Sequence, residues 1–95
     1  MTQDDEVQQA KRVGRDLANE RALVVFAGKL RKSDSATLCG ALKMSFEKGR
    51  TEIPGRLVKE ELPNHLFRTA ETEYLNTTST ILGSVVNGTY RPPGT

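Results

Sequence analysis

Residues 75–88 read LNTTSTILGSVVNG, and the interpretation of this stretch decides the fold of the chain. Its aliphatic residues recur at the three- and four-residue spacing of a helix, but four consecutive hydroxyl residues at 77–80 interrupt them. Hydroxyl side chains compete with a helical backbone for hydrogen bonds, and threonine is restricted at χ1. Because Asn87 and Gly88 form a typical helix end, we interpret the stretch as the second half of a long helix that begins near Asn64.

The first 27 residues predict a second long amphipathic helix. Acidic residues at 4–6 suit the positive end of a helix dipole. The run at 22–27, ALVVFA, is apolar on all sides and could form a short strand, but the chain has no convincing second strand to pair with it. A buried helix end is the simpler interpretation. Gly14 costs about 1 kcal/mol relative to alanine in a helix interior and indicates a close helix contact. The apolar face consists of Val7, Ala10, Val13, Leu17 and Val24.

A third segment with helical periodicity follows a break at 28–35. Ser33 or Ser35 can cap its first turn, with Asp34 close to the positive end of the dipole. Gly49 is expected to end this helix. Its apolar face consists of Leu38, Leu42 and Phe46, with Cys39 and Ala41 beside them.

A short helix containing Pro54 is predicted next, with Thr51 as its cap. The alternative is a turn at Pro54 and Gly55 with the helix starting after it. The sequence therefore predicts an all-α fold of three to four helices, with the long first and last helices packed roughly antiparallel. We expect one helical domain over 1–90 and a disordered tail at 91–95. A chain of 95 residues with 36% hydrophobic residues has a small core, so we expect a homodimer.

The charges are nearly balanced, with 14 basic and 12 acidic residues. Residues 11–32 carry seven basic and two acidic residues, whereas residues 60–90 carry one basic and four acidic residues. The two halves could attract each other within one chain or between chains, or both could simply be solvated. No apolar run is long enough to span a membrane, and residues 1–6 do not resemble a secretion signal. We therefore expect a cytoplasmic protein without membrane contact, in which the single Cys39 is a packed thiol.

No set of residues indicates an enzyme, a cofactor or a metal site. His65 is the only histidine, and its position beside Pro63 and Asn64 favours a surface or capping role. The adjacent acidic pairs at 4–5 and 60–61 point to different faces of a helix, which argues against a catalytic carboxylate pair. The string AGKLRKSD at 27–34 lacks the spacing of a phosphate-binding loop. We expect no catalytic activity, no cofactor and no bound metal.

Nucleic-acid binding is the main alternative to protein binding. Basic clusters lie at 29–32 and 43–50, and segments 35–49 and 52–62 could form a helix-turn-helix. However, the second of these segments also carries three glutamates, which would repel phosphate, and the chain lacks aromatic platforms for single strands. The cations of the two clusters are Lys29, Arg31, Lys32, Lys43, Lys48 and Arg50.

Two short stretches resemble a known family. The motif LNT at 75–77 followed by ILG at 81–83 resembles the C-terminal helix of the TraM-type quorum-sensing antiactivators. The start of a helix in the same family is similar to the spacing of Leu30, Asp34, Thr37 and Leu38. This resemblance implies a small, all-helical, dimeric protein that binds and inactivates a LuxR-type transcription factor.

The sequence favours a non-enzymatic regulator over a DNA-binding protein. A small chain with few aromatic residues, two long amphipathic helices and no reactive site fits a protein that covers a surface on a protein partner. The resemblance implies a transcription factor as that partner. The predicted partner-binding residues on the last helix are Phe67, Tyr74, Leu75, Ile81 and Leu82, and a second predicted contact consists of Lys29, Arg31 and Lys32.

Overall fold

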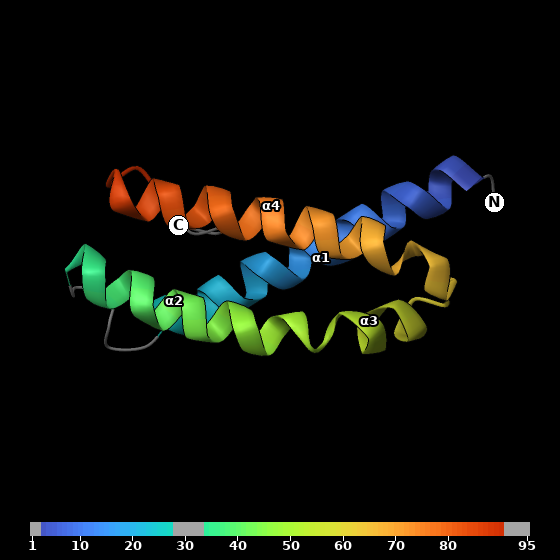
Figure 1. Ribbon diagram of the computed structural model, residues 1–95, viewed down its shortest axis with the longest axis horizontal. Helices are drawn as coiled ribbons and strands as arrows, with labels where there is room; N and C mark the ends of the chain where they lie inside the picture. Colours follow the sequence, from blue (N-terminus) through green and yellow to red (C-terminus); the bar gives the residue numbers. More distant parts are fainter. Residues whose placement is uncertain (1–2, 28–33, 91–95) are drawn as a thin grey trace.

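The computed structural model describes residues 3–27 and 34–90, and these have an all-α fold without a strand (Figure 1). This confirms the predicted fold class and the long first and last helices. The chain order is α1 (Gln3–Phe26), α2 (Ser35–Arg50), α3 (Ile53–Lys59), the 3₁₀ turn η2 (Asn64–Leu66) and α4 (Phe67–Val86).

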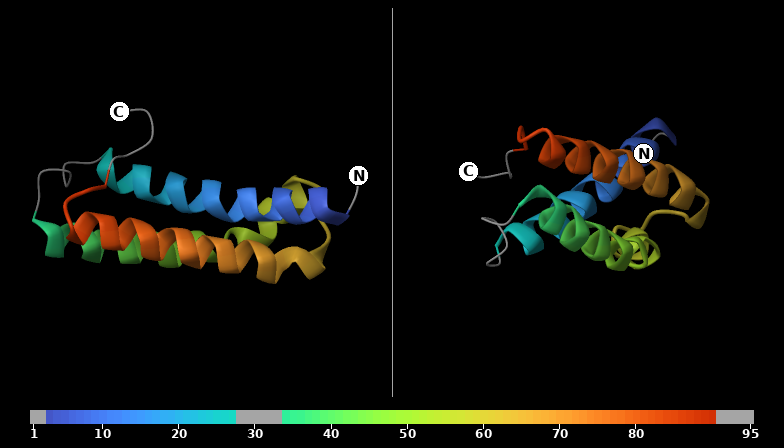
Figure 2. Two further views of the ribbon diagram at one scale, coloured as in Figure 1. Left: turned by 90° about the horizontal axis from the view of Figure 1, so that it is seen from above. Right: turned by 60° about the vertical axis from the view of Figure 1, so that its left-hand side comes forward.

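The helices form three legs, in which α1 and α4 point the same way and α2 and α3 together make the return leg (Figures 1 and 2). Two contacts fix the direction of α4 relative to α1. Arg15 pairs with Glu73 at 3.6 Å, and the ring of Phe26 stacks on Tyr90 with centroids 5.0 Å apart, so residue numbers rise together along both helices. The predicted antiparallel packing of α1 and α4 is therefore wrong. Because α2 and α3 follow each other along one side, α4 starts at the same end as α1.

The start of α2 differs from the prediction in its capping residue. Asp34, rather than either serine, is the N-cap, and its Oδ1 accepts a hydrogen bond of 2.8 Å from the backbone N–H of Thr37. This backbone N–H holds the pKa of Asp34 below its ordinary value. Ser35 is the first helical residue, and Ser33 lies outside the described residues. Aspartate can serve here because its carboxylate also interacts favourably with the helix dipole.

The junction between α2 and α3 also corrects two predictions. Gly49 does not end α2, which continues to Arg50, and Gly49 is instead a buried contact position. Thr51 does not cap α3 but follows the end of α2, where its hydroxyl donates to the carbonyl of Lys48 at 2.7 Å. Pro54 lies in the first turn of α3, as one of the two alternatives predicted.

The hydroxyl run at 77–80 is helical, as predicted, because its threonines bond to their own helix. Thr77 donates to the carbonyl of Glu73 at 2.8 Å, and Thr80 donates to that of Asn76 at 3.0 Å. Thr78 is buried and donates to the carbonyl of Leu75 at 2.9 Å. These bonds satisfy the hydroxyl groups without removing residues from the helix.

The predicted end of α4 is confirmed. Gly88 has a φ of 72°, and its N–H donates to the carbonyl of Val85 at 3.1 Å, while the N–H of Thr89 donates to that of Ser84 at 2.8 Å. This pair of bonds is a Schellman motif, in which glycine takes the left-handed position at little steric cost. The same pattern ends α3, but there Glu61 takes the left-handed position with a φ of 58°.

The core lies where α1 meets the other helices, and Gly14 gives it its closest contact. A methyl group at Gly14 would overlap the carbonyl oxygen of Ala70 and lie 3.0 Å from the amide nitrogen of Tyr74. The predicted close contact is therefore confirmed. Residues 22–26 belong to α1 as predicted, although Leu23 and Val24 are exposed rather than buried. Fully or almost fully buried side chains include Ala10, Leu17, Leu42, Ile53, Leu57 and Tyr74.

Candidate protein-binding groove

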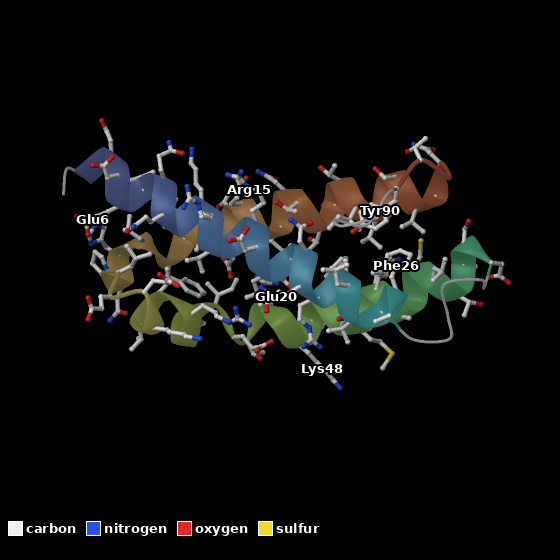
Figure 3. The ribbon with its side chains drawn as sticks, turned by 180° about the vertical axis from the view of Figure 1, so that it is seen from behind. Glu6, Arg15, Glu20, Phe26, Lys48 and Tyr90 are labelled. Atoms are coloured by element: carbon white, nitrogen blue, oxygen red, sulfur yellow. The ribbon has the colours of Figure 1, made fainter. Side chains whose placement is uncertain are left out.

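A groove runs between the antiparallel helices α2 and α4. It consists of two hollows of about 590 and 220 Å³ that share Lys43 and Leu82 as walls. Seen from behind, α1 lies across α2 and α4 (Figure 3). Because the lining residues come from α2 and α4 alone, the groove opens on the side away from α1.

The α4 wall of this groove is apolar and uncharged. Leu75, Leu82 and Val86 line it, and residues 74–90 contain no charged side chain at all. Val86 is 64% exposed and Leu75 is 40% exposed, so this wall leaves aliphatic surface in contact with water. Exposed aliphatic surface in a groove lowers the free energy of a complex when a partner covers it.

The α2 wall is mixed in character. Ala36 and Cys39 continue the apolar floor, whereas Lys43, Glu47 and Arg50 carry charges of both signs along the rim. The guanidinium of Arg50 is partly neutralised because its Nη2 lies 3.2 Å from a carboxylate oxygen of Glu71. An apolar floor between short charged rims can bind a helix.

Tyr74 joins the two walls beneath the groove. Its side chain is 1% exposed, and its hydroxyl donates to the carbonyl of Phe46 at 2.5 Å. Burial raises the pKa of Tyr74 to about 12, and the protonated hydroxyl is the donor in this bond. A methyl group on Gly49 would overlap this hydroxyl and the side chain of Arg21, which explains why α2 has glycine there.

The structure places the predicted partner-binding residues in different environments. Leu75 and Leu82 lie on the α4 wall, and Phe67 is half-buried at the start of α4, away from the groove lining. Tyr74 and Ile81 are only 1% and 4% exposed, which corrects the prediction that they offer a surface to a partner. Their stripe faces the core because α1 and α2 pack against it. The predicted basic contact at Lys29, Arg31 and Lys32 lies outside the described residues.

Sequence reasoning did not assign Ala36, Cys39 and Val86 to the site. Ala36, Cys39, Lys43, Glu47 and Arg50 follow each other at three- and four-residue spacing along α2. This spacing is a signal that one face of α2 points into the groove, but small and charged side chains made that face look like a solvated one.

The helix-turn-helix alternative does not match the arrangement of α2 and α3. These helices follow one another along the same leg instead of crossing (Figure 1). Lys48 points away from the bundle (Figure 3), and Arg50 is paired with Glu71. The helices α2 and α3 therefore do not form the crossed pair that this motif requires.

Ion pairs also join the helices elsewhere in the described chain. The pair of Arg15 with Glu73 joins the basic N-terminal half to the acidic C-terminal half, which is one of the predicted alternatives. Arg56 lies 2.6 Å from a carboxylate oxygen of Glu20, and this hydrogen bond raises the pKa of Arg56. Such exposed pairs contribute little stability, typically below about 1 kcal/mol each.

Two other kinds of site are absent from the described residues, 3–27 and 34–90. No three His, Cys, Asp or Glu side chains there come together as a metal site requires. Within the same ranges, no helix is both long and apolar enough to cross a membrane. Comparisons of the chain with protein-family models, curated proteins and solved structures found no match.

Proposed function

We propose that this chain is a non-enzymatic regulatory protein that binds a protein partner by accepting one of the partner's helices in the α2/α4 groove. Binding there would bury a surface of the partner and so inhibit it sterically. The observation that carries the proposal is the uncharged, aliphatic α4 wall formed by Leu75, Leu82 and Val86. The resemblance to the TraM-type antiactivators points in the same direction and suggests a transcription factor as the partner.

The spacing of the wall suits a helix as the bound element. Leu75, Leu82 and Val86 lie seven and four residues apart, which places them in one row along α4. An amphipathic helix presents its own apolar residues in a matching row, so the two rows can interdigitate along the groove. Lys43 and Glu47 on the rim would then select the polar residues that flank the partner's apolar face.

Binding can be tested before the partner is identified. Overlapping peptides that cover the proteins of the source organism are displayed, and those that bind the immobilised chain are selected. The dissociation constant of each selected peptide is then measured individually. We expect the selected peptides to be amphipathic helices. Their affinity should fall at least roughly tenfold for Val86→Arg, because this substitution forces a cation into the apolar groove. The matched control is Val58→Arg, since Val58 is also an exposed valine, 68% against 64%, but lies on α3 outside the groove.

Two results would contradict the proposal. One is the absence of any enriched peptide. The other is a set of peptides that bind Val86→Arg and Val58→Arg equally well, which would place binding on another face. Circular dichroism of both variants checks that each one is folded. Salt-sensitive binding of duplex DNA that is lost when Lys43 and Lys48 are replaced by alanine would favour the DNA-binding alternative instead.

A further inference from the structure

The outer face of α4 carries a second apolar row beside the one that faces the core. Leu75, Ser79, Leu82 and Val86 are separated by four, three and four residues, which is the spacing of a coiled-coil seam. Ser79 is exposed, Leu82 is half-buried, and Leu75 and Val86 retain 40% and 64% of their exposure. Within the described chain this row, which we name the outer seam, is not covered as a coiled-coil seam would be.

The charges on α4 allow the outer seams of two copies to pack against each other. Because residues 74–90 contain no charged side chain, two α4 helices can approach each other along this stretch without repulsion between like charges on α4. Ser79 is small, and a methyl group on the exposed Gly83 would meet nothing within 4 Å. Small residues at these positions leave room for a neighbouring helix to come close.

The side-chain sizes along the outer seams of two copies are also complementary when the two α4 helices run antiparallel. A twofold axis midway between Ser79 and Leu82 places Leu75 opposite Val86 of the second copy and Ser79 opposite Leu82 of the second copy. A small residue then faces a large one at each central contact, and the same contact recurs on both sides of the axis, as in any isologous interface. A parallel pair would instead place Ser79 against Ser79, leaving a gap, and would align the two helix dipoles unfavourably.

We propose that in the free protein a second copy of this chain occupies this face, with the two α4 helices antiparallel about that axis. This inference rests on the proposed function, because it assumes that the groove binds a helix. In the absence of a partner, that helix is α4 of the second copy. A partner's helix then replaces the second copy, so self-association and partner binding compete for the same face.

Sedimentation equilibrium tests the interface. The wild-type chain is expected to be dimeric, and Ser79→Arg is expected to raise its dimer dissociation constant at least roughly tenfold, because the twofold axis brings two arginines into the seam. The control is Thr80→Arg, since Thr80 is the adjacent residue, is also an exposed hydroxyl and lies outside the seam. Equal dissociation constants for the two variants would overturn the proposal.

A crossed disulfide tests the antiparallel direction. In a Cys39→Ser background, Leu75→Cys and Val86→Cys are purified separately, one of them with a size tag, and oxidised alone and as a mixture. The antiparallel seam predicts cross-linked dimers mainly in the mixture, because only Leu75 and Val86 of different copies face each other. Efficient cross-linking of either variant alone would overturn the antiparallel arrangement.

The failure of this inference can be told apart from the failure of the proposed function. A monomeric wild-type chain that still binds peptides through Val86 would overturn the twofold interface and leave the proposed function standing. A dimer with the crossed disulfide whose groove selects no peptide would support the interface and contradict partner binding. Peptides that bind the groove are expected to convert dimers into peptide-bound monomers, and peptide binding that leaves the dimer intact would overturn the competition.

Discussion

Gly14→Ala measures how closely α1 and α4 approach each other. On an exposed helix this substitution stabilises, because alanine is the better helix former by about 1 kcal/mol. At Gly14 the new methyl group would overlap the carbonyl oxygen of Ala70 and lie 3.0 Å from the amide nitrogen of Tyr74. Both atoms belong to the backbone of α4, so no change of side-chain rotamer can relieve the overlap. The two helices must move apart.

The expected cost exceeds the gain in helix propensity. Inserting a methyl group into a close-packed contact costs about 1–3 kcal/mol. The shift here also loosens Ala10 and Leu17, which lie on the same face of α1 and are 0% exposed. We therefore expect Gly14→Ala to lower the free energy of unfolding by up to about 2 kcal/mol net of the propensity gain. For a domain of this size, each kcal/mol lowers Tm by roughly 4–8 °C.

The matched control is Gly40→Ala, which should change stability in the opposite direction. Gly40 lies in α2 and is exposed, and a methyl group there would meet nothing within 4 Å. We expect this variant to gain about 0.5–1 kcal/mol. Urea unfolding followed by far-UV circular dichroism measures all three proteins at one fixed concentration, because self-association would otherwise affect the comparison. A Gly14→Ala protein as stable as Gly40→Ala would refute the close approach of α1 and α4.

Three further predictions concern single contacts. Tyr74→Phe should lower the free energy of unfolding by about 0.5–1.5 kcal/mol in a urea titration, because it removes the buried bond to the Phe46 carbonyl; an unchanged midpoint would show that this bond contributes nothing. Glu61→Gly should raise Tm through a gain of about 1 kcal/mol, because its φ of 58° is costly for a residue with a side chain, and a lower Tm would contradict this. Asp34 has a folded-state pKa below its ordinary value of 3.8, so its capping contribution should be complete above that value and lost as pH falls through the lower one. NMR of the Thr37 amide should report this loss, and Asp34→Ala should abolish it.

Local signals in the sequence predicted the helices but not the direction of the last one. Asn87 and Gly88 ended α4 as expected, and Pro54 was placed correctly in the first turn of α3, because each depends on a few neighbouring residues. The direction of α4 depends on whether residues 35–62 make one return leg or two. Propensity cannot decide this, because the junction at Thr51 contains no residue that forces a reversal.

Two of the residues predicted to form a partner-binding surface on α4, Tyr74 and Ile81, lie in the core instead. The sequence of α4 contains two neighbouring apolar rows, and helical spacing alone merges them into one wide stripe. Successive residues differ by about 100° around a helix, so Tyr74 and Leu75 cannot both face the core. Gly14 and Gly49 determine that Tyr74 is the residue that faces the core. Gly14 leaves room for the backbone at Ala70, and Gly49 leaves room for the hydroxyl of Tyr74.

Both glycines are far from α4 in sequence. The sequence indicated a close helix contact for Gly14 but not its partner, and it indicated only a helix end for Gly49. The atoms of α4 that each glycine admits are defined only when α1 and α2 pack on α4. Once Tyr74 is fixed in the core, Leu75 and Val86 must face outward. The proposed interface on α4 is therefore limited to the outer seam. Tyr74→Phe is then expected to lower stability, whereas Ser79→Arg is expected to weaken the proposed association. A Ser79→Arg protein that loses stability as a dilute monomer would show that the outer seam belongs to the core after all.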